Sequence, residues 1–274
     1  MEGIILVEFT HRTFSSLTGI LILVNAVVLW KQNRTDRLVR ILSVMSVVLL
    51  VLVGVMGGVN VLHKLPSGLT AIDMSFALLL LAVLVILTAK ARSKDGSVRA
   101  GSMQRSKVQQ PPVQAMYKPA LFTSAAVYLE SVIGGFFKHS SASHTYVHPE
   151  TPLANELITT FKTAELVMYV HMFSAFLVVL SLFWLLVYAR RCKVYCRQTL
   201  TLLILLGLQG FLGFFSLITK LELLTTTVHM AVAAMMLWIS TEIACRIKFA
   251  KAPSAADLQD NGRIPLSRTV VTNG

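Results

Sequence analysis

Long apolar segments separated by short polar ones run through the whole chain. Seven of the apolar segments are long enough to cross a bilayer, for which a helix needs about 20 residues. None shows the alternation of apolar and polar positions that is typical of outer-membrane strands. The pattern predicts an all-α fold, a polytopic membrane bundle of seven transmembrane helices. The predicted spans cover residues 10–30, 41–62, 70–89, 119–137, 165–188, 199–219 and 226–245.

Composition supports this prediction and excludes other classes of protein. Of the 274 residues, 55% are hydrophobic and only 14% are charged, whereas a soluble domain carries about 25% charged residues. The chain therefore lacks the polar residues that would cover a water-facing surface. A soluble globular enzyme, a disordered chain and a disulfide-stabilised scaffold are all excluded.

The positions of Lys and Arg predict the orientation of the spans. Segments 31–40, 90–118 and 190–197, together with the tail from Arg246, hold 20 of the 25 basic residues. Because cytoplasmic loops carry an excess of Lys and Arg, we expect a multi-pass protein of the cell membrane, with its N-terminus outside and its C-terminus in the cytoplasm. Anionic lipids facing these loops account for the net charge of +12, so no nucleic-acid partner is implied.

Changes in composition predict four regions. Residues 1–90 form a first half with spans 1–3, and residues 119–251 form a second half with spans 4–7. Between them, segment 91–118 is rich in polar residues, Gly and Pro, so we expect a flexible cytoplasmic linker. The polar tail 252–274 is expected to be disordered.

The two halves resemble each other in sequence. Val7–Val24 is similar to Val167–Trp184, and Gly54–Val85 is similar to Gly207–Ile239. Spans 1–3 and 5–7 are therefore predicted to be two copies of a three-helix unit with pseudo-symmetry, while span 4 has no counterpart before span 1. Each copy carries one polar residue on its first helix and one on its third. These residues are His11 and Asp73 in the first copy, and His171 and His229 in the second.

These four residues share one depth, near the outer surface, because all four spans run from outside to inside. An ionisable residue within a span is costly and is a functional candidate by default. Two imidazoles at equal depth on facing helices can ligate a haem iron from both sides. A single histidine at a membrane boundary more often snorkels to water, but the matched positions of His171 and His229 favour a haem site.

Other polar residues leave alternatives open. Glu8 lies on the same helical face as His11 and is either a proton relay or a solvated carboxylate. Glu130 lies well inside span 4 and must face the bundle, a partner or water. Three outer-loop histidines are either solvated or part of a metal site; they are His139, His144 and His148.

Short motifs resemble those of the haem A synthase family. Glu8-Phe-Thr-His11-Arg12 is similar to that family's glutamate–histidine–arginine signature. Gly57-Gly58, Leu65-Pro66 and Ala71-Ile72-Asp73 resemble its glycine pair, its leucine–proline turn and its Ala-x-His motif. Gln209-Gly210 and Thr227-Val228-His229 stand at the equivalent places of the second half. The resemblance covers residues 3–247, and its specificity lies in the order and duplication of the motifs.

The resemblance implies an activity and a set of site residues. Haem A synthases are membrane oxidoreductases that oxidise the C8 methyl of haem O to the formyl group of haem A, which serves the terminal oxidase. By this resemblance His171 and His229 would be axial ligands of a haem b cofactor. His11, with Arg12, would bind the substrate haem O and ligate its iron, and Glu8 would be the catalytically important carboxylate beside it.

Three departures from the family pattern affect the first half most. Seven spans are found where the family has eight, and His171 precedes Met172 where an arginine is common. Asp73 stands where the family has its second histidine. We expect that Asp73 either handles protons beside a five-coordinate haem on His11, as a third catalytic residue, or marks a degenerate substrate site.

The resemblance also implies partners, and two rival functions stay open. Expected partners are haem O and its synthase, an unidentified electron donor, the terminal oxidase as acceptor of the product, and the membrane; assembly as a homo-oligomer is compatible with the sequence. No dinucleotide-binding fingerprint is present, so electrons must come from a partner. The rivals are a membrane cytochrome b that only carries electrons, and a haem-assembly or transport protein.

Restoring the family's histidine with Asp73→His distinguishes the two hypotheses for Asp73. If Asp73 faces the iron of a haem ligated by His11, the variant should change the haem spectrum and the activity, because a second imidazole saturates the iron. Absorption spectra and product analysis of the purified protein provide the measurement. Unchanged spectra and activity would exclude a role at the iron.

Overall fold

A computed structural model of the chain describes residues 2–63, 68–94, 113–151, 157–220 and 223–250. For residues 2–8 and for residue 94 it describes the backbone alone. Within these ranges the chain is helical, with no strand.

Seven helices of the described residues are long and apolar enough to cross a membrane. Each overlaps one predicted span, which confirms the all-α fold and the seven-span prediction. The long helices are α1 (Glu2–Gln32), α2 (Arg37–Leu62), α3 (Leu69–Lys94), α4 (Tyr117–His139), α6 (Phe161–Cys192), α7 (Cys196–Ile218) and α8 (Leu223–Phe249). Two short helices, η1 (Val113–Met116) and α5 (Ala142–Val147), precede and follow α4.

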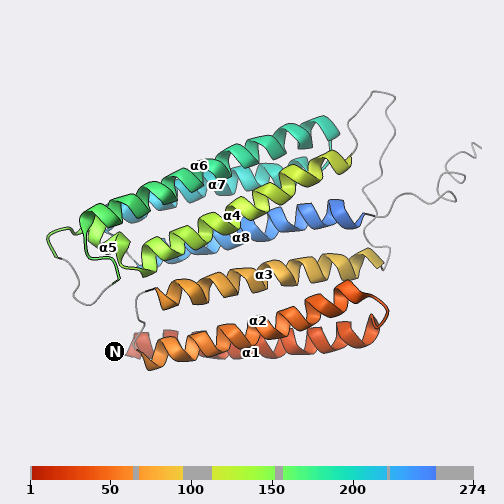
Figure 1. The fold of residues 1–274 in the computed structure, drawn as a ribbon, viewed down its shortest axis with the longest axis horizontal. Helices are drawn as coiled ribbons and strands as arrows, with labels where there is room; N and C mark the ends of the chain where they lie inside the picture. Colours follow the sequence, from red (N-terminus) through yellow and green to blue (C-terminus); the bar gives the residue numbers. More distant parts are fainter. Residues whose placement is uncertain (1, 64–67, 95–112, 152–156, 221–222, 251–274) are drawn as a thin grey trace, which may run out of the picture.

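The long helices lie side by side in one bundle, and successive helices run in opposite directions (Figure 1). Helices α1, α3, α6 and α8 begin at the end of the bundle where α5 lies. Helix α3 packs against α2 on one side and against α4 and α8 on the other, so it joins the two halves. Helix α4 contacts α3, α6 and α8. The predicted repeat stays a prediction, but α1 and α6, and likewise α3 and α8, run in the same direction.

Buried apolar side chains form a separate cluster in each half. The first-half cluster joins α1, α2 and α3 through residues such as Ile22, Leu49 and Leu87. The larger second-half cluster includes Leu182 and Leu185 of α6 with side chains of α4, α7 and α8. Leu78 of α3 belongs to this second cluster, which explains how the halves adhere.

Hydroxyl groups link α4 to its three neighbours. Thr123 Oγ1 donates to the carbonyl oxygen of Ser181 on α6 at 3.1 Å. The hydroxyls of Ser124 and Thr241, on α8, are 2.6 Å apart. Tyr128 Oη donates to a backbone carbonyl of α3 at 3.4 Å. In a bilayer such interhelical hydrogen bonds average about 0.6 kcal/mol each, and here they fix the rotation of α4 within the bundle.

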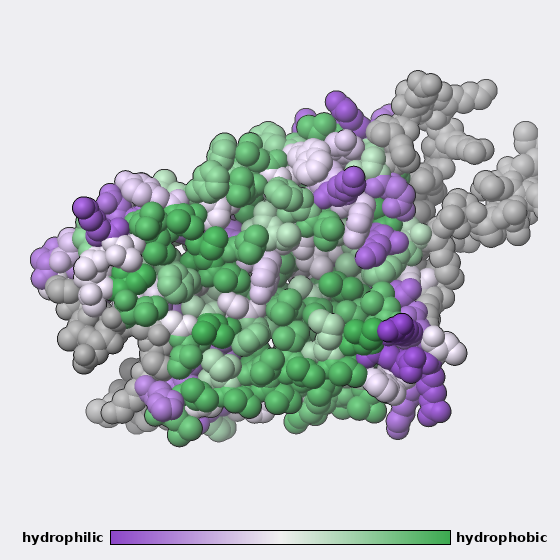
Figure 2. Space-filling view, viewed as in Figure 1, coloured by the Kyte–Doolittle hydropathy of each residue, from purple (hydrophilic) through white to green (hydrophobic). Residues whose placement is uncertain are grey.

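The outward faces of the helices are apolar. Phe14, Phe173 and Phe214 are exposed large side chains on three different helices. On the face drawn in Figure 2, a broad hydrophobic zone lies between two more hydrophilic ends. A surface of this kind suits contact with lipid chains rather than water, and the chain is a multi-pass membrane protein.

The predicted linker and the predicted tail fall largely outside the described residues. Helix α3 continues to Lys94 and η1 begins at Val113, so segment 91–118 is helical at both ends, and its role as a linker stays a prediction. Residues 95–112 and 251–274 are not described.

The start of α2 is capped by Asp36. Its side chain accepts hydrogen bonds from the backbone N–H groups of Leu38 and Val39, and it lies 3.5 Å from Lys90 Nζ of α3.

Leu182→Ala should destabilise the second half, because this side chain is fully buried in the cluster on α6. The expected loss is about 2 kcal/mol or more of unfolding free energy, as for other large-to-small core changes. Thermal unfolding in detergent measures it. The matched control is Phe183→Ala, on the next residue but 56% exposed; equal shifts in the two variants would contradict the assignment of the core.

Candidate functional site

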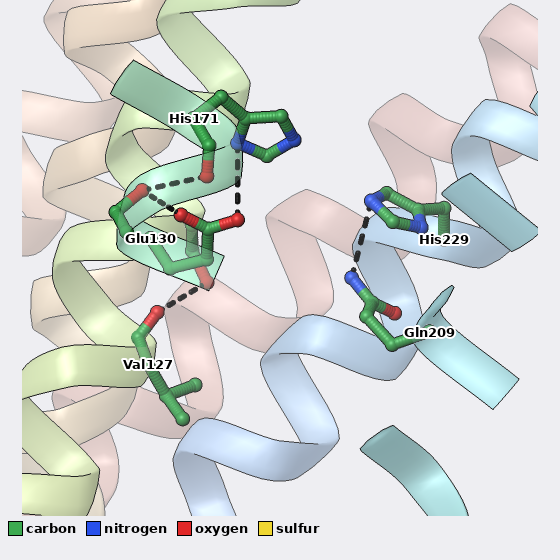
Figure 3. A network of polar contacts seen from close by, with 7 residues as sticks. Val127, Glu130, His171, Gln209 and His229 are labelled. Atoms are coloured by element: carbon green, nitrogen blue, oxygen red, sulfur yellow. Dashed lines mark hydrogen bonds and ion pairs between the residues drawn. The ribbon is translucent and has the colours of Figure 1, made fainter. Parts of the chain in front are cut away.

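Two histidines of the second half face one another across a common space. His171 lies on α6 and His229 on α8, both near the ends of these helices that lie beside α5. Figure 3 shows the two imidazoles on opposite sides of this space, with Glu130 of α4 beside the first and Gln209 of α7 beside the second. We refer to these four residues as the histidine-pair site.

His171 is held by a carboxylate inside the membrane span. Its Nδ1 lies 3.0 Å from Glu130 Oε1, and the two side chains are only 22% and 18% exposed. The contact has the distance of an ion pair without the angles of a hydrogen bond. The other oxygen of Glu130 accepts a hydrogen bond from the hydroxyl of Ser174, which also lies 3.0 Å from the carbonyl oxygen of His171. Two oxygens of one carboxylate thus have partners on α6.

Helix α4 also fixes the plane of the His171 ring. The ring of Phe137 stacks on it with centroids 5.9 Å apart and an angle of 17° between the planes. A Cβ atom at Gly134 would lie 2.9 Å from His171 Cε1, so only glycine leaves room for the imidazole. Glu130, Gly134 and Phe137 are spaced by four and three residues and therefore share one face of α4.

His229, on α8, is contacted by residues of α7 in a similar way. Gln209 Nε2 lies 3.2 Å from His229 Nε2, and a Cβ atom at Gly213 would lie 3.2 Å from His229 Cε1. The Nδ1 atom of His229 is buried without a hydrogen-bond partner. Each imidazole thus contacts a neighbouring helix at a polar residue and at a glycine four positions later. The polar group is a carboxylate beside one histidine and a neutral amide beside the other.

In the first half, Asp73 contacts α2. Asn60 is buried, and its Nδ2 donates to Asp73 Oδ2 at 3.3 Å. The second oxygen of Asp73 and the amide oxygen of Asn60 are buried without a hydrogen-bond partner. The two halves therefore share a feature. The carboxamide of Asn60 on α2 contacts Asp73 on α3, and the carboxamide of Gln209 on α7 contacts His229 on α8.

The other predicted first-half residues are not gathered around Asp73. His11 is exposed on α1, which packs mainly against α2, and His11 makes no hydrogen bond or ion pair with Asp73. Arg12 is exposed on the same helix. Glu8 lies in α1, but its side chain is outside the described residues. The structure thus places His171 and His229 on opposite sides of one space. It does not bring the residues predicted to bind haem O into contact with one another.

Sequence reasoning gave no role to Gly134, Phe137 or Gln209, and it left the partner of Glu130 undecided. A signal was present, because Glu130/Gly134 and Gln209/Gly213 repeat the same spacing of four in two different spans. The partner helix of each pair was not predictable from that spacing.

The three histidines that follow one another at the end of α4 and around α5 are His139, His144 and His148. The rings of His144 and His148 are 5.1 Å apart, and the backbone carbonyl of His139 accepts from the N–H of Gly68 at 2.9 Å. In the described residues, no group of three His, Cys, Asp or Glu side chains is placed to hold a metal ion. The hydrogen bond between Gly68 and His139 joins the turn before α3 to the end of α4.

Comparison with known proteins gives the family. No curated protein matches the chain. A family model described as cytochrome oxidase assembly protein matches residues 1–241, which covers all seven spans except the end of the last. The chain therefore belongs to the cytochrome oxidase assembly protein family, the family of the haem A synthases.

Proposed function

We propose that this protein is a haem A synthase-type oxidoreductase, which oxidises the C8 methyl of haem O to a formyl group and supplies haem A to the terminal oxidase. Its family connects it to cytochrome oxidase assembly. The observation that carries the proposal is the histidine-pair site, in which His171 and His229 face each other from α6 and α8 (Figure 3).

The residues of this site fit a haem b. Glu130 lies at Nδ1 of His171, so Nε2 of this ring is left for the iron, and it points away from Glu130 toward His229. The Nδ1 atom of His229 is buried, and its Nε2 contacts the amide of Gln209. Ligation through its Nε2 would replace the contact with Gln209, leaving the amide free to turn. When bound, the haem supplies the redox chemistry, and the protein orients it.

For the substrate, we propose a role for each predicted residue of the first half. His11 would ligate the iron of haem O and Arg12 would pair with a propionate of the macrocycle. Glu8 and Asp73 would hold protons. Asp73 suits this role because Asn60 engages one carboxylate oxygen while the other has no partner.

We also propose partners and a location for the protein. A haem O synthase would supply the substrate, a separate electron donor would deliver electrons, and the terminal oxidase would take the product. The chain would lie in the cell membrane with its N-terminus outside, as its basic residues favour. A homo-oligomer is compatible with this arrangement.

A second candidate is a membrane cytochrome b that carries electrons through the second-half haem alone. One observation favours it: the histidine-pair site is built by contacts from four helices, whereas His11 is exposed and makes no contact with Asp73. A carrier needs neither Glu8 nor His11.

Haem extraction from protein expressed beside a haem O synthase separates these functions. A pyridine haemochrome spectrum with chromatography should show haem B together with haem O or haem A, and Glu8→Ala should abolish haem A while haem B is kept. Haem B alone in the wild type would favour the carrier. A wild type without any haem would contradict both functions.

Gly213→Ala should reduce haem binding at His229, because the added methyl group would lie 3.2 Å from the imidazole and tilt it. Alanine is otherwise better than glycine in a helix by about 0.5–1 kcal/mol, so lost haem would not reflect a weaker helix. Haem per protein after purification is the measurement, with an expected loss of about tenfold in affinity. Gly210→Ala is the control, since nothing lies within 4 Å of its added methyl.

A further inference from the structure

We infer that Glu130 is a positioning residue for His171, and that its carboxylate makes His171 and His229 unequal as the residues that would hold the haem. This inference rests on the proposed function, because it assigns a role toward the haem of the histidine-pair site. Glu130 belongs to α4, which contacts α3, α6 and α8.

The first step is the placement of the carboxylate. Glu130 is 18% exposed and lies inside a span, where an isolated charge costs several kcal/mol. The ion-pair partner that the structure gives it is Nδ1 of His171. Its second oxygen accepts from Ser174, which is one turn after His171 on the same helix. One oxygen of the carboxylate therefore faces the imidazole, while Ser174 holds the other.

The second step is the chemistry of the ring. A carboxylate beside Nδ1 favours the tautomer that carries its proton on that nitrogen, which leaves the lone pair of Nε2 for a metal. A carboxylate partner also makes the imidazole a stronger donor. Because a stronger donor favours the higher charge on iron, Glu130 should lower the reduction potential of the haem. The described residues place no hydrogen-bond partner at the Nδ1 of His229, and the polar neighbour of this ring is the neutral amide of Gln209, so His229 lacks this effect.

The third step is the rigidity of the arrangement. Phe137 stacks on one side of the His171 ring and Gly134 leaves room for the ring at its Cε1 edge. With Glu130, these residues hold the imidazole from a single helix face. The ring is therefore oriented before a haem binds, and α4 acts as a template for one axial ligand.

The test compares three variants of the full chain purified with haem. Glu130→Gln keeps the shape of the side chain and removes its charge, and Ser174→Ala removes the hydroxyl that orients it. The control is Glu165→Gln, also on α6, where an exposed carboxylate accepts a hydrogen bond from Tyr169 at 3.0 Å. The readouts are haem content, the midpoint potential of the haem and its low-spin electron paramagnetic resonance spectrum.

The expected results differ between variants. Glu130→Gln should raise the midpoint potential, change the g values and weaken haem binding by about 10–100-fold. Ser174→Ala should shift the potential in the same direction by less, and Glu165→Gln should leave all three readouts unchanged. A merely structural role would lower haem content without moving the potential of the haem that stays bound.

Two outcomes would overturn the inference, and they are distinguishable. If the wild type binds haem and Glu130→Gln has the wild-type potential and spectrum, the inference is wrong while the proposed function stands. If the wild type binds no haem, the proposed function and the inference fail together. Should Glu130→Gln fail to fold, Ser174→Ala decides, because an unchanged potential in that variant contradicts the carboxylate's role.

Discussion

The interior of a bilayer offers no water to hydrogen-bond a polar side chain, so every such group must find its partner within the protein. The position of α4 illustrates this constraint. Its carboxylate, Glu130, contacts α6, and its hydroxyls, on Thr123 and Ser124, contact α6 and α8. The rotation of α4 that satisfies these groups also places Gly134 and Phe137 against His171. The hydrogen-bonding needs of the polar side chains on α4 thus determine how this helix contacts His171 in the histidine-pair site.

The polar residues of the two halves meet this constraint in different ways. In the second half, both histidines have partners on adjacent helices and face a shared space. In the first half, Asp73 is engaged by Asn60 of α2, while His11 is exposed on α1. The histidine-pair site is therefore supported by contacts from several helices, whereas the polar residues of the first half are not gathered in one place.

The spans were predictable because length and apolarity alone determine whether a helix crosses a membrane. The common depth of His171 and His229 was predictable for the same reason, since the direction of each span follows from the number of spans before it. The partners of these histidines were not. Glu130 and Ser174 are 44 residues apart, and sequence spacing does not give the rotation of one helix about another. The four predicted regions stay a prediction, and the apolar pattern alone did not show that α3 continues to Lys94.

The contact between α4 and α6 has a consequence for biosynthesis. Helix α4 is the least apolar of the seven spans, and its carboxylate leaves the ribosome before the residues that neutralise and hydrogen-bond it. At about 5–20 residues per second, the 44 residues from Glu130 to Ser174 take about 2–9 s to synthesise. Until then α4 holds an uncompensated polar group, so its stable integration depends on the arrival of α6. Pairing with α6 therefore favours the stable integration of α4, and a ribosome that stalls between the two helices leaves Glu130 without its partners.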